Sequence, residues 1–188
     1  LDLYVFEQVC KTLHKWEIEG LPMVPISVNF AGSTLRQENI VDKMLLLIEK
    51  YHVLCEYLEV EVSESNLDMN QEMLAETSSK IRKANVRVIL DHFGAKTSSF
   101  SILSIMEFDG LKLDESLITN LVGNSRSRIV SKAVIDICRQ LGAAVLAEGV
   151  ETQDQLNVLN ELNCDYAQGT LFNKPIKVET FEVRYLKE

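Results

Sequence analysis

The chain has 188 residues, of which 46% are hydrophobic and 25% are charged. This length favours one domain with its own core over two. The 28 acidic residues outnumber the 19 basic ones, and the formal net charge of −9 argues against a long nucleic-acid polymer held on a basic surface. An anionic ligand would therefore need metal ions or local hydrogen-bond donors.

The cysteines and the apolar runs indicate a cellular setting. The four cysteines are widely scattered and form no CxxC pair, which favours reduced thiols over a disulfide framework. No apolar run approaches the roughly 20 residues that a membrane-spanning helix needs, and the N-terminus lacks a basic region followed by an apolar core. We therefore expect a cytoplasmic domain, whose parent protein could be membrane-anchored.

Short β-branched runs alternate along the chain with longer amphipathic segments. In chain order, the expected elements are helix 3–16, strand 24–29, helix 40–51, strand 57–62, helix 70–84, strand 86–90, strand 110–113, helix 127–141, strand 143–147, helix 152–162 and a weaker strand 165–168. Asn70 and Thr152 are suitable N-caps for two of these helices. Strands that alternate with helices and lack hairpin turns are expected to be parallel, with crossover helices between them.

The strand runs VRVIL (86–90) and AAVLA (143–147) are apolar on both faces, which is typical of parallel strands covered by helices outside and filled inside. This pattern favours a barrel or a doubly wound sheet. A Rossmann-type sheet would carry GxGxxG after its first strand, and the sequence has none. We therefore predict an α/β fold, the greater part of a TIM-like (β/α) barrel, in one domain over 1–188.

Polar residues stand at the carboxyl end of each predicted strand. They are Asn29, Glu61, Asp91, Lys112, Glu148 and Gln168. In a (β/α) barrel the loops at these ends converge on one mouth, where the chemistry takes place. Each residue alone has a structural explanation; Asn29, for example, suits a turn, and Glu148 suits the start of the next helix. Six such residues in succession indicate a functional site.

The residue types at this mouth favour one chemistry. Asn29, Glu61 and Asp91 supply the oxygen ligands that Mg²⁺ or Mn²⁺ prefers. Lys112 among carboxylates could hold its positive charge toward a phosphoryl oxygen or an attacking water. No Ser–His pair stands nearby, which argues against acyl transfer, so the set favours metal-assisted phosphodiester hydrolysis.

Six motifs of the chain, taken in order, resemble those of the EAL-domain phosphodiesterases of bacterial cyclic di-GMP signalling. SVNFAG resembles the family's VNLS segment, EVSES its ExTE motif, DHFG with the following TSSF its DDFGTGYSSL, LKLD its KID, AEGVETQDQL its AEGVET with QL, and QGTLFNKP its QGYLFSKP. The resemblance runs from the first helix to Pro175.

The resemblance implies a reaction and its metal ligands. The family opens cyclic di-GMP to linear pGpG with Mg²⁺ or Mn²⁺ at a two-metal site. By resemblance, Asn29, Glu61 and Asp91 bind metal, and Asp91 touches both ions. Lys112 is implied to contact and help activate the nucleophilic water.

The resemblance also implies roles for further mouth residues. Glu148 and Gln168 would contribute to the metal and water network as part of the catalytic set. Glu64 matches the glutamate that steadies the loop after DDFG, and Asp114 and Glu151 match further residues of the mouth. The family further implies a homodimer and an upstream sensory or GGDEF-type domain in the parent protein.

Three departures from the family pattern bear on activity. The Glu-Ala-Leu motif, which supplies a metal-binding glutamate on the family's first strand, would lie before Leu1, so we expect the barrel to lack that strand in this chain. His92 stands where the family has the second aspartate of DDFG, and an imidazole there weakens Mg²⁺ binding while still suiting Mn²⁺, Zn²⁺ or Fe²⁺. A role for His92 as a hydrogen-bonding loop residue is an equal alternative. Lys96 replaces a glycine of the family loop, which predicts weaker coupling to dimerisation and substrate.

These observations predict a cyclic di-GMP-binding domain of EAL type with weak or lost phosphodiesterase activity. One alternative is an active metal-dependent phosphodiesterase in which His92 serves as a ligand. Another is a protein-interaction module that binds no nucleotide.

Overall fold

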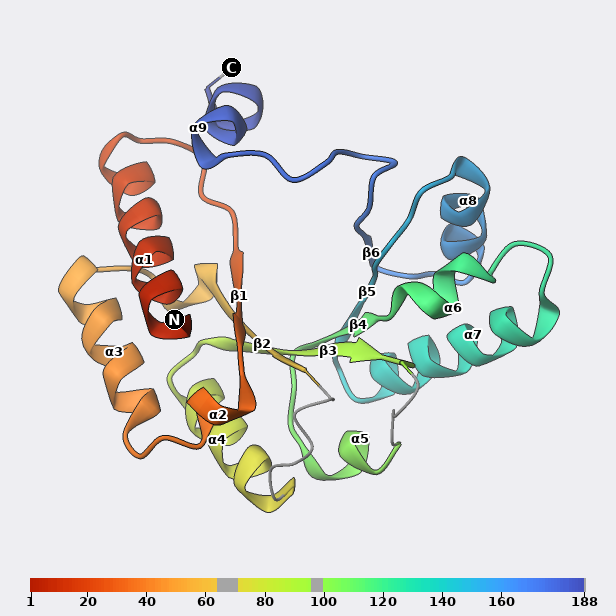
Figure 1. Cartoon of the computed structure of the whole chain (residues 1–188), viewed down its shortest axis with the longest axis horizontal. Coiled ribbons are helices and arrows are strands. Elements are labelled where there is room, and N and C mark those ends of the chain that lie inside the picture. The colour runs from red at the N-terminus through yellow and green to blue at the C-terminus, as the bar shows by residue number, and fades with distance from the viewer. Residues whose placement is uncertain (64–70, 96–99, 188) are drawn as a thin grey trace.

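The structure, a computed structural model, describes residues 1–63, 71–95 and 100–187 of the chain. Within these ranges, six parallel strands form one sheet in the order β1-β2-β3-β4-β5-β6. The strands are β1 (Ile26–Phe30), β2 (Leu58–Ser63), β3 (Arg87–Phe93), β4 (Gly110–Leu113), β5 (Ala144–Ala147) and β6 (Tyr166–Ala167). The helices surround this sheet on its outer side (Figure 1). The predicted TIM-like α/β fold is confirmed.

The longer helices lie where the apolar spacing predicts them. They are α1 (Asp2–Ile18), α3 (Ile40–Tyr51), α4 (Gln71–Lys83), α7 (Ser125–Gln140) and α8 (Gln153–Glu161). The predicted N-cap Thr152 is confirmed, because its side chain accepts a hydrogen bond from the Gln155 backbone in a capping box. The other predicted N-cap, Asn70, lies outside the described residues.

Several short elements were not predicted. They are α2 (Gly32–Leu35), the 3₁₀ turn η1 (Cys55–Tyr57), α5 (Ser101–Ile105), α6 (Glu115–Thr119), α9 (Val178–Phe181) and the π-helical turn η3 (Glu182–Leu186). Each has five residues or fewer, which is too short to show a helical period in its apolar residues. None of the helices in the described ranges combines the length and the apolar character that crossing a membrane requires.

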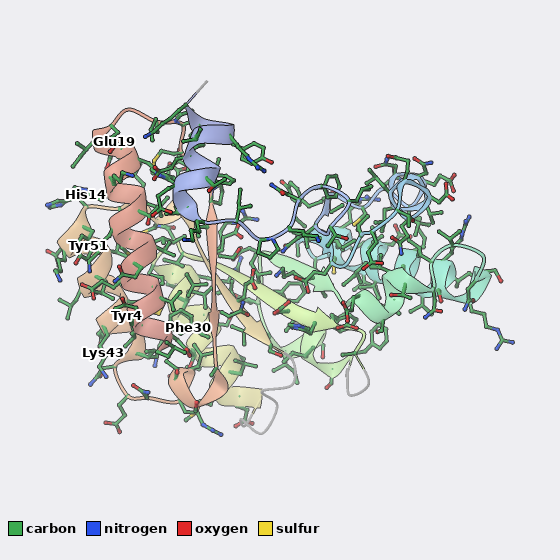
Figure 2. The ribbon with its side chains drawn as sticks, turned by 45° about the horizontal axis from the view of Figure 1, so that its top comes forward. Tyr4, His14, Glu19, Phe30, Lys43 and Tyr51 are labelled. Carbon is green, nitrogen blue, oxygen red and sulfur yellow. The ribbon has the colours of Figure 1, made fainter. Side chains whose placement is uncertain are left out.

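The core lies between the sheet and its surrounding helices. Alternate strand residues such as Val60, Val88 and Leu111 point outward and are almost fully buried. Helix α1 lies beside β1, which carries Phe30 (Figure 2). The rings of Phe6 on α1 and Phe30 on β1 make an edge-to-face contact with their centroids 5.9 Å apart. The intervening strand residues therefore face the interior of the partial barrel, where the polar side chains gather.

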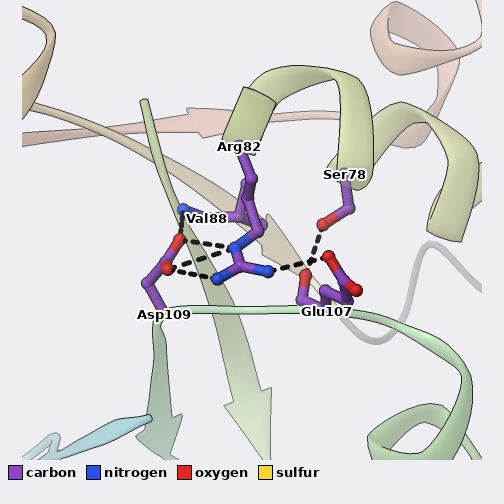
Figure 3. A network of polar contacts seen from close by, with 5 residues as sticks. All are labelled: Ser78, Arg82, Val88, Glu107 and Asp109. Atoms are coloured by element: carbon purple, nitrogen blue, oxygen red, sulfur yellow. Dashed lines mark hydrogen bonds and ion pairs between the residues drawn. The ribbon is translucent and has the colours of Figure 1, made fainter. Parts of the chain in front are cut away.

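Aspartates that precede two strands tie them to their neighbours at the end opposite the mouth. Asp109, before β4, accepts a hydrogen bond of 2.9 Å from the Val88 backbone in β3 and a bidentate contact from Arg82 of α4 (Figure 3). Asp165, before β6, accepts one of 2.8 Å from the Val145 backbone in β5. The two carboxylates therefore serve as hydrogen-bond acceptors for backbone N–H groups near the starts of β3 and β5. Without them these N–H groups would be buried without a partner.

The C-terminal segment ties the two ends of the chain together. After β6 the chain crosses to α1 and ends in α9 and η3 (Figure 1). Glu182, which is 3% exposed, accepts hydrogen bonds of 2.8 Å from the Trp16 indole and from the Lys15 ammonium. Trp16 also stacks on Phe181 at 6.0 Å. The last turn is thus held on α1 by a buried carboxylate.

Replacing Glu182 with glutamine should destabilise the fold at neutral pH and matter less in acid. The hydrogen bonds from Lys15 and then Trp16 lower the pKa of the Glu182 carboxyl below its usual value of 4.5. A carboxyl whose pKa is lower in the folded than in the unfolded protein stabilises the fold at pH values above its unfolded pKa. This stabilisation is lost as the pH falls through the folded pKa. In urea unfolding, the difference in the free energy of unfolding between the unsubstituted protein and Glu182→Gln should therefore be constant around neutral pH. It should become smaller below about pH 4.5.

The unfolding can be followed by the emission of Trp16, which is the single tryptophan of the sequence. Glu17→Gln is the control, because Glu17 is exposed on the same helix. A difference in the free energy of unfolding between the unsubstituted protein and Glu182→Gln that stays constant down to pH 3 would contradict the assigned contacts.

Candidate active site

Lys112 of β4 lies at the centre of a buried charged group. Its neighbours Leu111 and Leu113 pack into the core, so the alternation of the strand turns the lysine inward. The Lys112 ammonium lies 3.0 Å from Oε2 of Glu61, 2.7 Å from Oε1 of Glu148 and 3.7 Å from Oδ1 of Asp91. Four of the six predicted strand-end residues are therefore brought into mutual contact.

The charges of this group keep Lys112 protonated. Burial pushes the pKa of the Lys112 ammonium down, but the hydrogen bond with Glu148 and the charges of Glu61 and Asp91 outweigh it and raise the pKa above 10.5. One ammonium faces three carboxylates, so the group carries a formal charge of −2. Such a group attracts a cation into the mouth.

A bulge in β3 places His92 beside Asp91. The pairing register between β3 and β4 shifts between Leu90 and Phe93, and His92 adopts a left-handed conformation with φ of 58°. The Asp91 side chain is buried, whereas that of His92 is 53% exposed. Nδ1 of His92 lies 2.7 Å from Oδ2 of Asp91, and its backbone N–H donates to Oδ1 at 2.9 Å.

Asp91, His92 and Glu148 form a group that could hold a metal ion. One ligand atom from each lies within 4.8 Å of the other two. Two carboxylates and an imidazole suit a divalent cation of borderline character. The residues present therefore fit one such ion. Two aspartates at positions 91 and 92 would offer one more anionic ligand than Asp91 and His92 do.

Two other predicted strand-end residues lie at the mouth without joining the Lys112 group. The register of β1 and β2 aligns Asn29 with Glu61, and the Asn29 side chain is exposed. Gln168 follows β6, where its backbone pairs with Ala147 at 2.8 Å and Val150 at 3.0 Å, and its side chain is exposed. Their implied roles in binding metal and ordering water stay predictions.

The remaining predicted residues are placed differently. Asp114 is buried and caps α6, because its Oδ1 accepts a hydrogen bond of 2.9 Å from the Ser116 backbone. Glu151 is exposed, and its backbone N–H donates to Gln155. Glu64 and Lys96 lie outside the described residues.

Two glycines allow the mouth loops to approach closely. Gly149 follows Glu148 with φ of +73°, and a Cβ there would lie 2.6 Å from the Cβ of Glu115. Gly169 follows Gln168, and its Cβ would lie 2.1 Å from the carbonyl oxygen of Val150. Because only glycine fits these close approaches, Gly149 and Gly169 help to fix the places of the preceding residues, Glu148 and Gln168.

Two cavities adjoin the charged group. The larger, of about 720 Å³, opens between His92, Asp114, Glu148 and Gln168 and the C-terminal segment. The smaller, of about 310 Å³, lies inside the sheet and is lined by Glu61, Lys112 and Gln168 among others. Lys112 and its carboxylates therefore lie between the inside of the sheet and the open mouth.

Reasoning from strand ends missed a second polar layer inside the partial barrel. Glu59 accepts hydrogen bonds from Ser27 and Arg87, which stand on the neighbouring strands. The sequence contains a signal for this layer. Side chains of a strand alternate between its two faces, so Glu59, two residues before Glu61, lies on the same face as Glu61. The C-terminal residues Phe181 and Tyr185, which line the larger cavity, were also missed, because they lie beyond the last predicted strand.

Comparison with known proteins agrees with this architecture. The family model described as EAL domain matches residues 1–175. Cyclic di-GMP phosphodiesterase NbdA of Pseudomonas aeruginosa is 31% identical to the chain over 182 residues, which cover 97% of the chain and 23% of that relative. The chain spans between 22% and 24% of the length of the first curated relatives it matches.

Solved structures show the same fold. The EAL domain of Mycobacterium smegmatis DcpA has a TM-score of 0.90 with 26% identity, over 97% of this chain and 82% of that one. The PaMucR phosphodiesterase, solved as a c-di-GMP complex, has a TM-score of 0.86 with 25% identity, over 95% of this chain and 72% of that one. The match of the family model over nearly the whole chain shows that this protein belongs to the EAL domain family.

Proposed function

We propose that this domain binds cyclic di-GMP at the barrel mouth and hydrolyses it weakly or not at all. The observation that carries the proposal is the contact of one buried ammonium, Lys112, with Glu61, Asp91 and Glu148, next to His92. The first feature suits a metal and phosphodiester site. His92 places an imidazole where an acid of that site would stand.

Binding is supported by the cavity and by the relatives. A volume of about 720 Å³ lies within the usual range of ligand pockets, and its lining combines acids with aromatic side chains. A relative is named a cyclic di-GMP phosphodiesterase, and a structural neighbour was solved with c-di-GMP. We assign the same ligand to this chain.

The residues of this chain divide the work of phosphodiester cleavage. A divalent cation bound at Asp91, His92 and Glu148 would supply Lewis acidity and an activated water. Lys112 stays protonated near neutral pH, so it donates hydrogen bonds and positions a water or a phosphoryl oxygen rather than removing a proton. Glu148 would hold the ion and its water beside Lys112, whose ammonium lies 2.7 Å from Oε1 of Glu148.

His92 accounts for the weak turnover. Mg²⁺ prefers carboxylate and water oxygens in an octahedral arrangement. His92 also holds Oδ2 of Asp91 in a 2.7 Å contact, which competes with ligation by that oxygen. A second ion, as in the family's two-metal site, would have one anionic ligand fewer at this position.

A fully active, metal-dependent phosphodiesterase is the second candidate. It is favoured by the closeness of Asp91, His92 and Glu148, whose ligand atoms lie within 4.8 Å of one another. In that enzyme His92 replaces the missing carboxylate as a ligand.

Four further expectations stay predictions. They are a single domain over 1–188, a cytoplasmic location, a homodimer and an upstream sensory or GGDEF-type domain.

Calorimetry with cyclic di-GMP, followed by chromatography of the products, tests the proposal. We expect micromolar or tighter binding and little pGpG with Mg²⁺. His92→Asp should raise the turnover with Mg²⁺ by about 10–100-fold, because it restores an anionic oxygen ligand. His92→Asn is the matched control, since asparagine also tolerates the left-handed backbone but stays neutral.

The outcomes separate the candidates. Turnover at a rate typical of the family with His92 in place would overturn the claim of weak activity, and loss of that turnover in His92→Ala would then favour the second candidate. No binding of cyclic di-GMP would favour a module that interacts with proteins alone.

A further inference from the structure

His92 is arranged as a metal ligand whose orientation is already fixed. Its Nδ1 lies 2.7 Å from Oδ2 of the buried Asp91, at hydrogen-bond distance. In a neutral imidazole, an Nδ1 that donates this hydrogen bond leaves Nε2 with a free lone pair. Histidines that bind metals usually donate their other ring nitrogen to a carboxylate in this way.

The surroundings of His92 leave room for an ion. The His92 side chain is 53% exposed and lines the cavity of about 720 Å³, which Glu148 also lines. Lys112 lies nearest to Oδ1 of Asp91 and to Oε1 of Glu148, whereas the His92 imidazole contacts Oδ2 of Asp91. The lysine and the imidazole therefore approach different oxygens of the Asp91 carboxylate.

We propose that this site selects a borderline divalent ion, with Zn²⁺ as the type case, over Mg²⁺, and that Nε2 of His92 is the ligand that sets this choice. In this arrangement Asp91 is the carboxylate that orients the imidazole, and Glu148 is the acidic ligand that accompanies Nε2. The inference rests on the proposed metal site of the domain but concerns the choice of ion in this chain. Imidazole nitrogen suits zinc, iron and nickel, whereas Mg²⁺ requires a set of oxygen ligands and gives up its bound water reluctantly.

A hydrogen-bonding role for His92 in the loop makes a different prediction. A loop histidine that only contacts Asp91 would leave the order of metal affinities to the carboxylates. Its replacement by aspartate would then strengthen the binding of Zn²⁺ and Mg²⁺ together, because the added charge attracts every cation. The two roles therefore differ in the sign of the change for Zn²⁺.

The test is a titration of the metal-free protein with Zn²⁺ alone and with Mg²⁺ alone. In His92→Asp we expect Zn²⁺ affinity to fall by about 10-fold or more and Mg²⁺ affinity to rise. His52→Asp is the matched control, since His52 is also exposed and has a similar left-handed φ of 53° but caps the C-terminal end of α3 and lines neither cavity of the site. It should leave both affinities unchanged.

Nuclear magnetic resonance of ¹⁵N-labelled imidazoles gives a readout that does not depend on nucleotide. The sequence has three histidines, so the signals lost in His92→Asp identify those of His92. Zn²⁺ should shift Nε2 of His92 and leave the signals of His14 and His52 in place.

Each result decides the inference. Tighter Zn²⁺ binding in His92→Asp, or an unshifted His92 signal at saturating Zn²⁺, would overturn it. Failure to bind cyclic di-GMP would overturn the proposed function alone, because the metal titration and the imidazole signals contain no nucleotide.

Discussion

Replacing Lys112 with methionine should destabilise the metal-free domain strongly and make added metal stabilise it more. The variant leaves Glu61, Asp91 and Glu148 facing one another without their shared cation. Removing one partner of a buried ion pair costs about 3–5 kcal/mol, which corresponds to roughly 6–20 °C in Tm for a chain of this length. A divalent ion would then replace the lost positive charge, so Mn²⁺ should raise the Tm of the variant more than that of the unsubstituted protein.

Thermal unfolding with and without Mn²⁺ measures both effects. Lys132→Met serves as the control, because Lys132 forms a half-exposed surface pair with Asp136 on α7, and surface pairs contribute about 0–1 kcal/mol. If Lys112→Met and Lys132→Met unfolded at the same temperature, Lys112 would not be the ion that balances the three acids.

Replacing Gly169 with alanine should disrupt the loops that carry Gln168 and Glu148. The added Cβ would lie 2.1 Å from the carbonyl oxygen and 2.4 Å from the amide nitrogen of Val150. The contact is with backbone, so no side-chain rotation relieves it, and Leu171 and Val150 would lose their hydrogen bond of 3.1 Å. We expect a loss of about 3 kcal/mol or more, the upper end for overpacking, together with weaker binding of cyclic di-GMP.

Gly142→Ala distinguishes this collision from backbone strain. Gly142 has φ of +75°, and a methyl group added there would meet no atom within 4 Å, so alanine introduces strain but no collision. That change should cost about 1–2 kcal/mol, the cost of a non-glycine residue in the left-handed region, and leave nucleotide binding intact. Urea unfolding of both variants, with calorimetry of cyclic di-GMP, makes the comparison; equal losses in the two would argue against the close approach.

The strands and the charged group were predictable because both depend on local alternation. Runs such as 86–90 are apolar on both faces, and each predicted run has a polar residue at or next to its carboxyl end. Parallel strands bring their carboxyl ends to one edge, which is why Lys112, Glu61, Asp91 and Glu148 could be placed together in advance. Their distances depend on the register between strands, which a single sequence does not contain.

Other features depend on contacts between distant segments. The bulge that turns His92 beside Asp91 arises from a register shift between β3 and β4, and the prediction ended that strand at residue 90. The docking of η3 depends on a tertiary pair, Trp16 with Glu182, that no period reveals. Likewise Asp114 was assigned to the mouth by resemblance, whereas its carboxylate also caps α6.

The attachment of Glu182 to Trp16 also has an entropic side. Ser27 and Glu59, which pair on the neighbouring strands β1 and β2, are 32 positions apart in the chain, whereas Trp16 and Glu182 are 166 positions apart. The entropy of closing a loop grows only with the logarithm of its length, so the longer closure costs about 1.5 kcal/mol more than the shorter one. Two charge-assisted hydrogen bonds of ordinary strength offset that difference. The contact between the first helix and the last turn therefore adds a long-range closure to the fold at little entropic cost.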